Sequence, residues 1–222
     1  MPIEHRVLDA NTRDLRPEVL DSSGRLKVMP ASYYAQTTVD ERAVLGLRTA
    51  AYVLPTLELV GWLKLAIGMR TAIEIGAGNG LVAESLGITA TDSCMQERED
   101  IALLMKAMGQ RPVQYGRNIQ RYSAEEALKK YKPKVVVACW VTHKFDERRH
   151  EAEGNMDGVV EEDVVANCES YIFIGNKHVH RNKSLWKQPH AYFEPPWLYS
   201  RAFNGSADFI AVWGKPPDVA PA

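Results

Sequence analysis

Residues 71–81 read Thr-Ala-Ile-Glu-Ile-Gly-Ala-Gly-Asn-Gly-Leu, and this stretch decides the fold. The apolar run at 72–75 predicts a short strand, and glycines follow it at Gly76, Gly78 and Gly80. Glycine adopts backbone angles that are closed to residues with a Cβ atom, and it lets a ligand approach the amides of the turn. The helix expected after the turn adds the positive end of its dipole. The stretch therefore predicts a strand, a tight turn and a helix that together hold a cofactor.

The spacing of the glycines favours one class of cofactor over another. The dinucleotide fingerprint has glycine at its first, third and sixth positions, and the sixth glycine allows close packing of the helix. Here Leu81 occupies the sixth position and Glu74 lies inside the strand. A nicotinamide-dependent oxidoreductase is therefore the weaker alternative. The pattern Glu-x-Gly-x-Gly-x-Gly at 74–80 resembles motif I of the class I S-adenosylmethionine-dependent methyltransferases.

This resemblance continues along the chain. A short helix is expected over 81–86, closed by Gly87, and a strand over 88–91 that ends at Asp92. In the family, an acidic residue at the end of the second strand accepts hydrogen bonds from both ribose hydroxyls, and Asp92 matches it by position. The resemblance covers roughly Thr56 to Gly214 and is most specific from Glu74 to Asp92. The resemblance implies S-adenosylmethionine as cofactor. The chain is also similar to methyltransferase-like proteins of bacteria and phages, a similarity that implies no particular substrate.

The resemblance also implies a set of cofactor contacts. Glu74 and the backbone of the glycine loop would hold the methionine end of the cofactor, and the residues after Asp92 would lie along the adenine. The remaining expected contacts are Ala77 in the loop, Ser93 and Met95 beside Cys94 and Gln96, Asn118 after the third strand, and Cys139 at the end of the fourth strand.

Hydrophobic periodicity places the other elements. Capping boxes at 38–41 and 123–126 begin two helices, the first reaching Tyr52 and the second ending before Pro133. Further helices are expected at Thr56–Ile67, Glu97–Met108 and Val159–Cys168, and strands at Val135–Cys139, Tyr171–Gly175 and Phe209–Trp213. This alternation predicts an α/β fold with a doubly wound, mostly parallel sheet, which the resemblance makes a seven-stranded Rossmann-like methyltransferase fold with an N-terminal helical extension. Ligands then bind at the carboxyl ends of the strands.

Chemistry is expected where the fourth strand ends, at Ala138-Cys-Trp-Val-Thr-His-Lys144. Family members that methylate amino groups of nucleic-acid bases or of glutamine often have Asp/Asn-Pro-Pro-Tyr here, so this chain departs from that class. Trp140, Thr142 and His143 are left to face the transferred methyl group. His143 is the candidate general base because its ordinary pKa lies near neutrality. The alternative is that His143 only hydrogen-bonds the loop and that methyl transfer depends on alignment alone.

Length and composition are those of one domain. The chain has 222 residues, 45% of them hydrophobic, which is enough for a single core. We expect an N-terminal arm and helix over 1–55, with an extended arm up to Leu26, an α/β core over 56–214 and a tail over 215–222. The net charge of −1 differs from the strongly positive net charge that is typical of a dedicated nucleic-acid binder. The lysine-rich stretches 129–134 and 177–187 are interpreted as solvated faces. A small-molecule acceptor is therefore favoured over nucleic acid.

Other features limit location and ligands. The three cysteines lack metal spacing, the N-terminus has no apolar leader, and no apolar run approaches about 18 residues, so a cytoplasmic protein without a membrane span is expected. His178 and His180 lack a close third ligand, so no metal site is predicted. The charged loop 144–158 is either a lid over the substrate or a surface loop. A catalytically idle cofactor-binding or interaction module on the same fold remains the main alternative to an enzyme.

Overall fold

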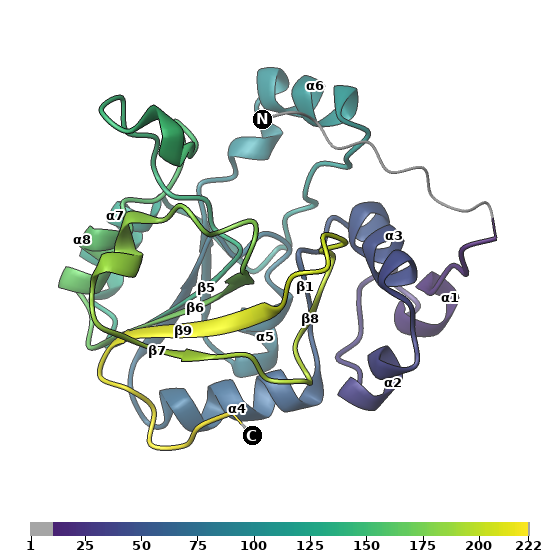
Figure 1. The fold of residues 1–222 in the computed structure, drawn as a ribbon, viewed down its shortest axis with the longest axis horizontal. Helices are drawn as coiled ribbons and strands as arrows, with labels where there is room; N and C mark the ends of the chain where they lie inside the picture. Colours follow the sequence, from purple (N-terminus) through teal and green to yellow (C-terminus); the bar gives the residue numbers. More distant parts are fainter. Residues whose placement is uncertain (1–10, 222) are drawn as a thin grey trace.

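The computed structural model describes residues 11–221 and is built around a seven-stranded sheet (Figure 1). The strand order is β4-β3-β2-β5-β6-β9-β7, and β9 alone runs antiparallel to its neighbours. The strands are β2 (Ala72–Ile75), β3 (Thr89–Asp92), β4 (Ile119–Arg121), β5 (Val135–Cys139), β6 (Ser170–Asn176), β7 (His190–Phe193) and β9 (Asp208–Gly214). The predicted doubly wound, mostly parallel sheet is confirmed.

Helices cover both faces of the sheet. α4 (Leu57–Ile67) and α5 (Leu81–Leu86) pack on one face, and α7 (Ala124–Tyr131) and α8 (Glu161–Ala166) on the other (Figure 1). Side chains alternate between the faces along β5, because Val135 and Val137 contact the first pair of helices whereas Val136 and Ala138 contact the second. All four are fully buried, which is why this strand is a continuous apolar run.

The capping boxes form as predicted. The Thr38 hydroxyl accepts from the Glu41 N–H at the start of α3 (Val39–Thr49), and the Ser123 hydroxyl accepts from the Glu126 N–H at the start of α7. In both, the backbone N–H of the capping residue donates to the glutamate carboxylate. The end of the first helix differs from the prediction: α3 stops at Ala50, which has φ +52°, and not at Tyr52.

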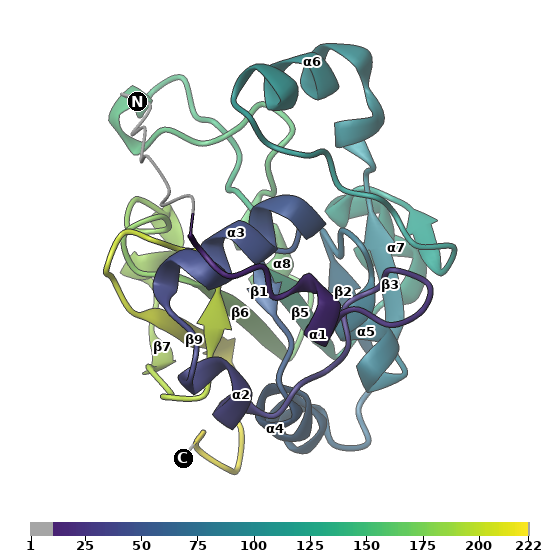
Figure 2. The same cartoon turned by 90° about the vertical axis from the view of Figure 1, so that its right-hand side faces the viewer.

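The N-terminal segment packs against the core as a further layer. α1 (Arg16–Val19) and α2 (Ala31–Ala35) lie with α3 along one side of the molecule (Figure 2). Leu15 and Val19 are buried against Leu45 and Leu54. The expectation of an extended arm is therefore wrong for 15–26, and its first ten residues lie outside the described part of the chain. A small sheet of β1 (Val53–Leu54) and β8 (Tyr199–Ser200), not predicted, joins this layer to the C-terminal half.

Two further expectations are corrected on the way to the site. β4 begins at Ile119, so Asn118 precedes the third strand of the core and does not follow it. The helix expected over 97–108 forms as η1 (Met95–Glu97) and α6 (Glu99–Ala107). It is not a core layer, because Leu103 and Leu104 are 60% and 54% exposed and α6 stands apart from the sheet (Figures 1 and 2). The short helices η2 (His150–Ala152) and η3 (Ser184–Lys187) and strand β7 lay outside the predictions.

Candidate functional site

The glycine loop has the backbone that its sequence predicts. Gly76, Gly78 and Gly80 have φ values of +57°, +56° and +76°, in the region that side chains with a Cβ atom rarely adopt. The Ala77 N–H donates to the carbonyl oxygen of Thr91 at 3.0 Å, so the loop is folded against the end of β3. The turn leads directly into α5, which begins at Leu81.

Each glycine meets a different neighbour. A Cβ atom at Gly76 would come within 2.5 Å of a methyl group of Val141, and one at Gly80 within 2.7 Å of Ile119, so these two glycines allow close packing of the protein itself. A Cβ atom at Gly78 would lie 3.6 Å from Val113, in ordinary contact. Both Gly78 and Val113 line a cavity, so a side chain at 78 would fill ligand space. This is the cradle that a bound cofactor requires.

Asp92 ties the end of β3 to the glycine loop. Its carboxylate accepts from the Gly78 N–H through Oδ2 at 2.9 Å and from the Cys94 N–H through Oδ1 at 2.8 Å. The residue is 9% exposed, and burial raises its pKa while the two N–H donors and a hydrogen bond from the Tyr115 side chain oppose that rise. A carboxylate oxygen has a second lone pair. Beside these three donors, Asp92 therefore keeps acceptor capacity for a hydroxyl group of a ligand.

The glycine loop, Asp92 and the end of β5 converge on one cleft. Its inner cavity, of about 160 Å³, adjoins a second cavity of about 390 Å³ that shares Gly76, Ser93 and Met95 with it. We call the two together the cleft; it lies at the carboxyl ends of β2, β3 and β5. The predicted residues brought together in its wall are Gly76, Gly78, Asp92, Ser93, Met95, Cys139, Trp140 and Thr142. Glu74 and Ala77 line a small adjoining hollow of about 50 Å³.

Besides Glu74 and Ala77, three further predicted residues do not line the cleft. Gly80 is buried beneath Asn118, whose side-chain amide donates to the Gly80 carbonyl oxygen at 3.4 Å. Asn118 thus supports the glycine loop from the other side. His143 lines a separate cavity under the loop 144–158, and its Nε2 lies 3.1 Å from the Ala152 carbonyl oxygen. Burial lowers the pKa of His143, and nearby Lys183 adds to that effect. The structure thus turns His143 toward the loop and away from the cleft.

Glu74 is a buried carboxyl between β2 and α5. It is 1% exposed and accepts from the Ala83 N–H at 2.8 Å. Burial raises its pKa to about 8, and the hydrogen bonds from Ala83 and from the Cys139 side chain only partly offset this effect. At pH 7 the carboxyl is therefore mostly protonated, and it sits beside the loop backbone that was expected to hold the methionine end.

Trp140 carries backbone strain at the end of β5. Its φ is +58°, rare for a bulky residue, and its ring packs 5.9 Å from that of Tyr52 and 5.2 Å from that of His180. The indole Nε1 is buried and has no hydrogen-bond partner within residues 11–221. Strained residues and unpaired buried donors are uncommon, and both occur preferentially at functional sites.

A buried ion pair fixes the segment after Trp140. The Lys183 ammonium group is fully buried and donates to Glu161 at 2.6 Å and to the Val141 carbonyl oxygen at 2.9 Å. The Tyr171 hydroxyl donates to the other oxygen of Glu161 at 2.7 Å. Burial lowers the pKa of Lys183 and Glu161 opposes that shift. Because Val141 also packs on Gly76, this network sets the position of 140–142 relative to the glycine loop.

The loop 144–158 contributes part of the wall of the cleft. Asn155, Asp157 and Gly158 line its inner cavity, and Arg98 on the far side forms an ion pair with Asp157 at 2.9 Å. Bridges between His143 and Val159 and between Lys144 and Asn155 pair the two ends of the loop with each other. Of the two alternatives for this loop, the geometry favours a cover for the cleft.

Sequence reasoning missed several residues of the wall. Gln96, which was expected along the adenine, does line the cleft. The missed residues are Tyr52, Val113, Tyr115 and Tyr122. They come from the end of the N-terminal layer and from segments beside β3 and β4, and no motif identifies them. Tyr52 offers the one usable signal, because it is an aromatic residue just before Pro55 and the core.

Comparisons with known proteins found only distant similarity to solved structures. No protein-family model matches the chain, and no curated protein matches it. Among solved structures, WbdD with the kinase inhibitor LY294002 is 11% identical with a TM-score of 0.41, covering 82% of this chain and 43% of WbdD. The ribosomal protein L11 methylase from Lactobacillus delbrueckii subsp. bulgaricus is 15% identical with a TM-score of 0.33, covering 70% and 77%. SMU.776 complexed with SAH is 9% identical with a TM-score of 0.34, covering 67% and 47%.

The fold is the Rossmann-like methyltransferase fold. The seven-stranded sheet and the glycine loop after its central strand β2 agree with the expectation drawn from motif I. The chain spans less than half the length of WbdD and of SMU.776, and the low identities and TM-scores carry no argument about activity. No helix in the described part of the chain is long and apolar enough to cross a membrane. Within residues 11–221, no group of three His, Cys, Asp or Glu side chains is placed to hold a metal ion.

Proposed function

We propose that this protein binds S-adenosylmethionine in the cleft and transfers its methyl group to an acceptor that lies against Trp140 and Thr142. The observation that carries the proposal is the convergence of three features on one cavity: the open cradle at Gly78, the buried carboxylate of Asp92 and the strained end of β5. When bound, the cofactor supplies a methyl group on a positively charged sulfur.

The chain's own residues provide binding and alignment. Asp92 offers an acceptor to a hydroxyl group of the cofactor, and the glycine at 78 leaves room for the cofactor to lie against the loop backbone. Tyr52 and residues 155–159, at the end of the loop 144–158, exclude water from the cleft. Lys183 holds the 140–142 segment against Gly76 through the Val141 carbonyl oxygen. Because His143 faces the loop, the proposal rests on alignment of the acceptor and not on a general base.

Calorimetry with S-adenosylhomocysteine and with NAD tests the proposal. We expect binding of S-adenosylhomocysteine and none of NAD. Asp92→Ala should weaken the binding by about 1.5–3 kcal/mol, the scale for hydrogen bonds to a charged group. Asp92→Asn, which keeps one oxygen acceptor, should lose less. Binding of NAD in place of S-adenosylhomocysteine would contradict the proposal.

Turnover separates an enzyme from an idle cofactor-binding module. The assay follows formation of S-adenosylhomocysteine from S-adenosylmethionine in the presence of candidate acceptors. Tight cofactor binding without turnover on any acceptor would favour the idle module, which would keep the glycine loop and Asp92 but need no strained Trp140. A Trp140→Phe variant keeps an aromatic ring but removes the indole N–H together with the second ring, and it should lower turnover with little change in cofactor affinity.

A further inference from the structure

The N-terminal layer and the segment 111–118 enclose an open cavity of about 640 Å³ beside the cleft. Five arginines line it: Arg16, Arg25, Arg48, Arg111 and Arg117. We call it the arginine cavity. Glu84 is the one acidic residue among its lining residues. A volume of this size is in the range of small-ligand sites, so a group larger than a single ion fits inside.

Carboxylates neutralise only part of this positive charge. Asp14 forms ion pairs with Arg16 at 2.6 Å and with Arg48 at 2.9 Å, and these contacts lower its pKa to about 2. Glu84 is paired with Arg25. These two carboxylates face five guanidinium groups, which is an excess of three positive charges, and Arg111 and Arg117 form no ion pair within residues 11–221.

Arg111 and Arg117 are the guanidinium groups best placed to take a ligand. Arg111 donates to the carbonyl oxygen of Arg48 at 3.3 Å, a contact that leaves its charge unneutralised. Arg117 makes no ion pair or hydrogen bond with any residue of the described chain, and both side chains belong to exposed residues. A guanidinium group carries five N–H donors in a planar fork that matches the oxygens of phosphate.

The arginine cavity shares walls with the proposed cofactor site. Tyr115 lines both the arginine cavity and the cleft, and Asn79 and Leu81 line both the arginine cavity and the hollow beside Glu74. An anion in the arginine cavity would therefore lie next to the glycine loop while leaving the cleft open. This arrangement suits an extended ligand that is anchored at one cavity and presents another part at the cleft.

We propose that the arginine cavity binds phosphate groups of the methyl acceptor. That these phosphates belong to a methyl acceptor rests on the proposed function, whereas phosphate binding in the arginine cavity does not. Phosphate fits better than a carboxylate, because a single carboxylate charge would leave most of the excess positive charge uncompensated. The same chemistry is offered by a small phosphate ester and by the backbone of a nucleic acid. The net charge of −1 conceals this site, since its arginines come from separate segments of the chain.

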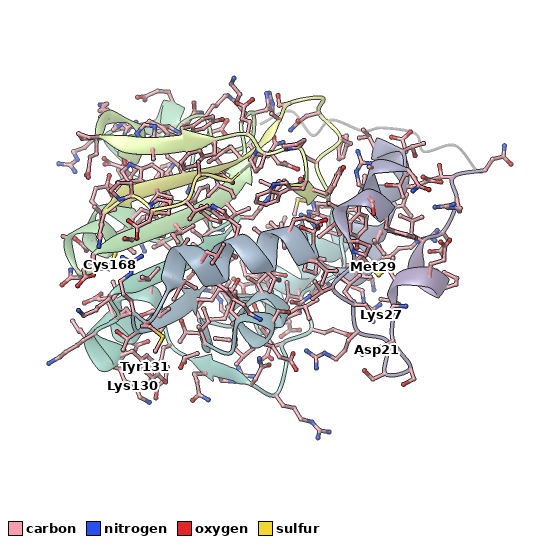
Figure 3. The ribbon with its side chains drawn as sticks, turned by 90° about the horizontal axis from the view of Figure 1, so that it is seen from below. Asp21, Lys27, Met29, Lys130, Tyr131 and Cys168 are labelled. Atoms are coloured by element: carbon pink, nitrogen blue, oxygen red, sulfur yellow. The ribbon has the colours of Figure 1, made fainter. Side chains whose placement is uncertain are left out.

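Calorimetry with inorganic pyrophosphate at low ionic strength tests the site without any cofactor. We expect the native protein to bind pyrophosphate and the double variant Arg111→Gln, Arg117→Gln to bind at least about tenfold more weakly, because both guanidinium groups donate charged hydrogen bonds. The matched control is Lys129→Gln with Lys134→Gln, which removes the same charge. These lysines flank Lys130, which lies on the opposite side of the molecule from Asp21 and Lys27 of the N-terminal layer (Figure 3).

The outcomes separate a built site from general charge attraction. Loss of binding in the arginine pair and retention in the lysine pair supports the site. No binding by the native protein, or equal losses in both pairs, overturns it. Tighter binding of a single-stranded oligonucleotide than of a mononucleotide, with a steep salt dependence, identifies a nucleic-acid acceptor, and equal affinities identify a small phosphate ester.

S-adenosylhomocysteine binding, measured on the same preparations, keeps the two proposals apart. The arginine pair should bind S-adenosylhomocysteine like the native protein, because neither residue lines the inner cavity of the cleft. A native protein that binds pyrophosphate but not S-adenosylhomocysteine would refute the proposed function and leave the phosphate site standing. The reverse result would remove the phosphate site alone.

Discussion

Glu74→Gln should make the protein less sensitive to pH. In the folded state the carboxyl has a pKa of about 8 because it is buried, compared with 4.5 for an ordinary glutamate. Between these values the unfolded chain has released this proton while the folded chain keeps it. The free energy of unfolding of the native protein therefore falls as pH rises, by about 1.4 kcal/mol per pH unit from this group. The contribution is fully present below pH 4.5 and is lost by about pH 8.

The magnitude follows from the two pKa values. Ionisation of Glu74 should lower the free energy of unfolding by about 3 to 4 kcal/mol between pH 5 and pH 8. Glutamine is neutral and of similar shape, and its side-chain oxygen can still accept from the Ala83 N–H. Its effect is therefore nearly constant with pH, and other ionisable groups cancel when the two proteins are compared. The Cys139 thiol, whose pKa burial raises well above its ordinary value, does not enter this window.

Urea denaturation at pH 5, 6, 7, 8 and 9 measures the difference. The variant should gain stability relative to the native protein up to pH 8 and then level off. A difference that stays flat across this range would refute the reasoning, because Glu74 would then ionise as it does in water. The ammonium group at the amino acid end of S-adenosylhomocysteine, bound beside Glu74, would lower the pKa of this carboxyl, so binding at pH 7 should release a proton from the native protein and none from the variant. Calorimetry in buffers of different ionisation enthalpy detects that proton.

Three further predictions concern the loop, the ion pair and the histidine. Gly78→Val should weaken S-adenosylhomocysteine binding at least about tenfold, because the side chain fills the cradle. The control Gly205→Val has a similar φ of +74° and open space around it, so it carries comparable backbone strain but should bind normally. Equal affinities of the two variants would mean that the loop is only a turn. Lys183→Met should lower the free energy of unfolding, measured in urea, by about 3–5 kcal/mol, because it leaves the Glu161 carboxylate buried and unpaired. Adding Glu161→Leu should restore much of the lost stability. A loss below about 1 kcal/mol in Lys183→Met would contradict this prediction. His143→Ala should lower the melting temperature but reduce turnover only in proportion to the folded protein lost, and a hundredfold fall in turnover at an unchanged melting temperature would restore its role as a general base.

The sequence by itself determined the elements whose causes are local. The glycine loop follows from the backbone angles that only glycine adopts freely, and all three glycines have positive φ. The helix starts at Thr38 and Ser123 follow from side chains that satisfy the N–H groups of their own first turn. The strand over 135–139 follows from an apolar run long enough to be buried on both faces. The position of Asp92 was also predictable, because the strand expected over 88–91 ends at this residue.

Only the tertiary structure decided what depends on contacts between distant segments. The short strands β1 and β8 carry too few residues for a periodic signal and exist because they pair with each other. The direction of His143 depends on the bridges that pair the two ends of its loop, and the exposure of α6 depends on the absence of a partner within the described chain. The arginine cavity gathers side chains from five positions spread between 16 and 117. No local pattern encodes such proximity, because the free energy that closes these long loops comes from burial elsewhere in the core.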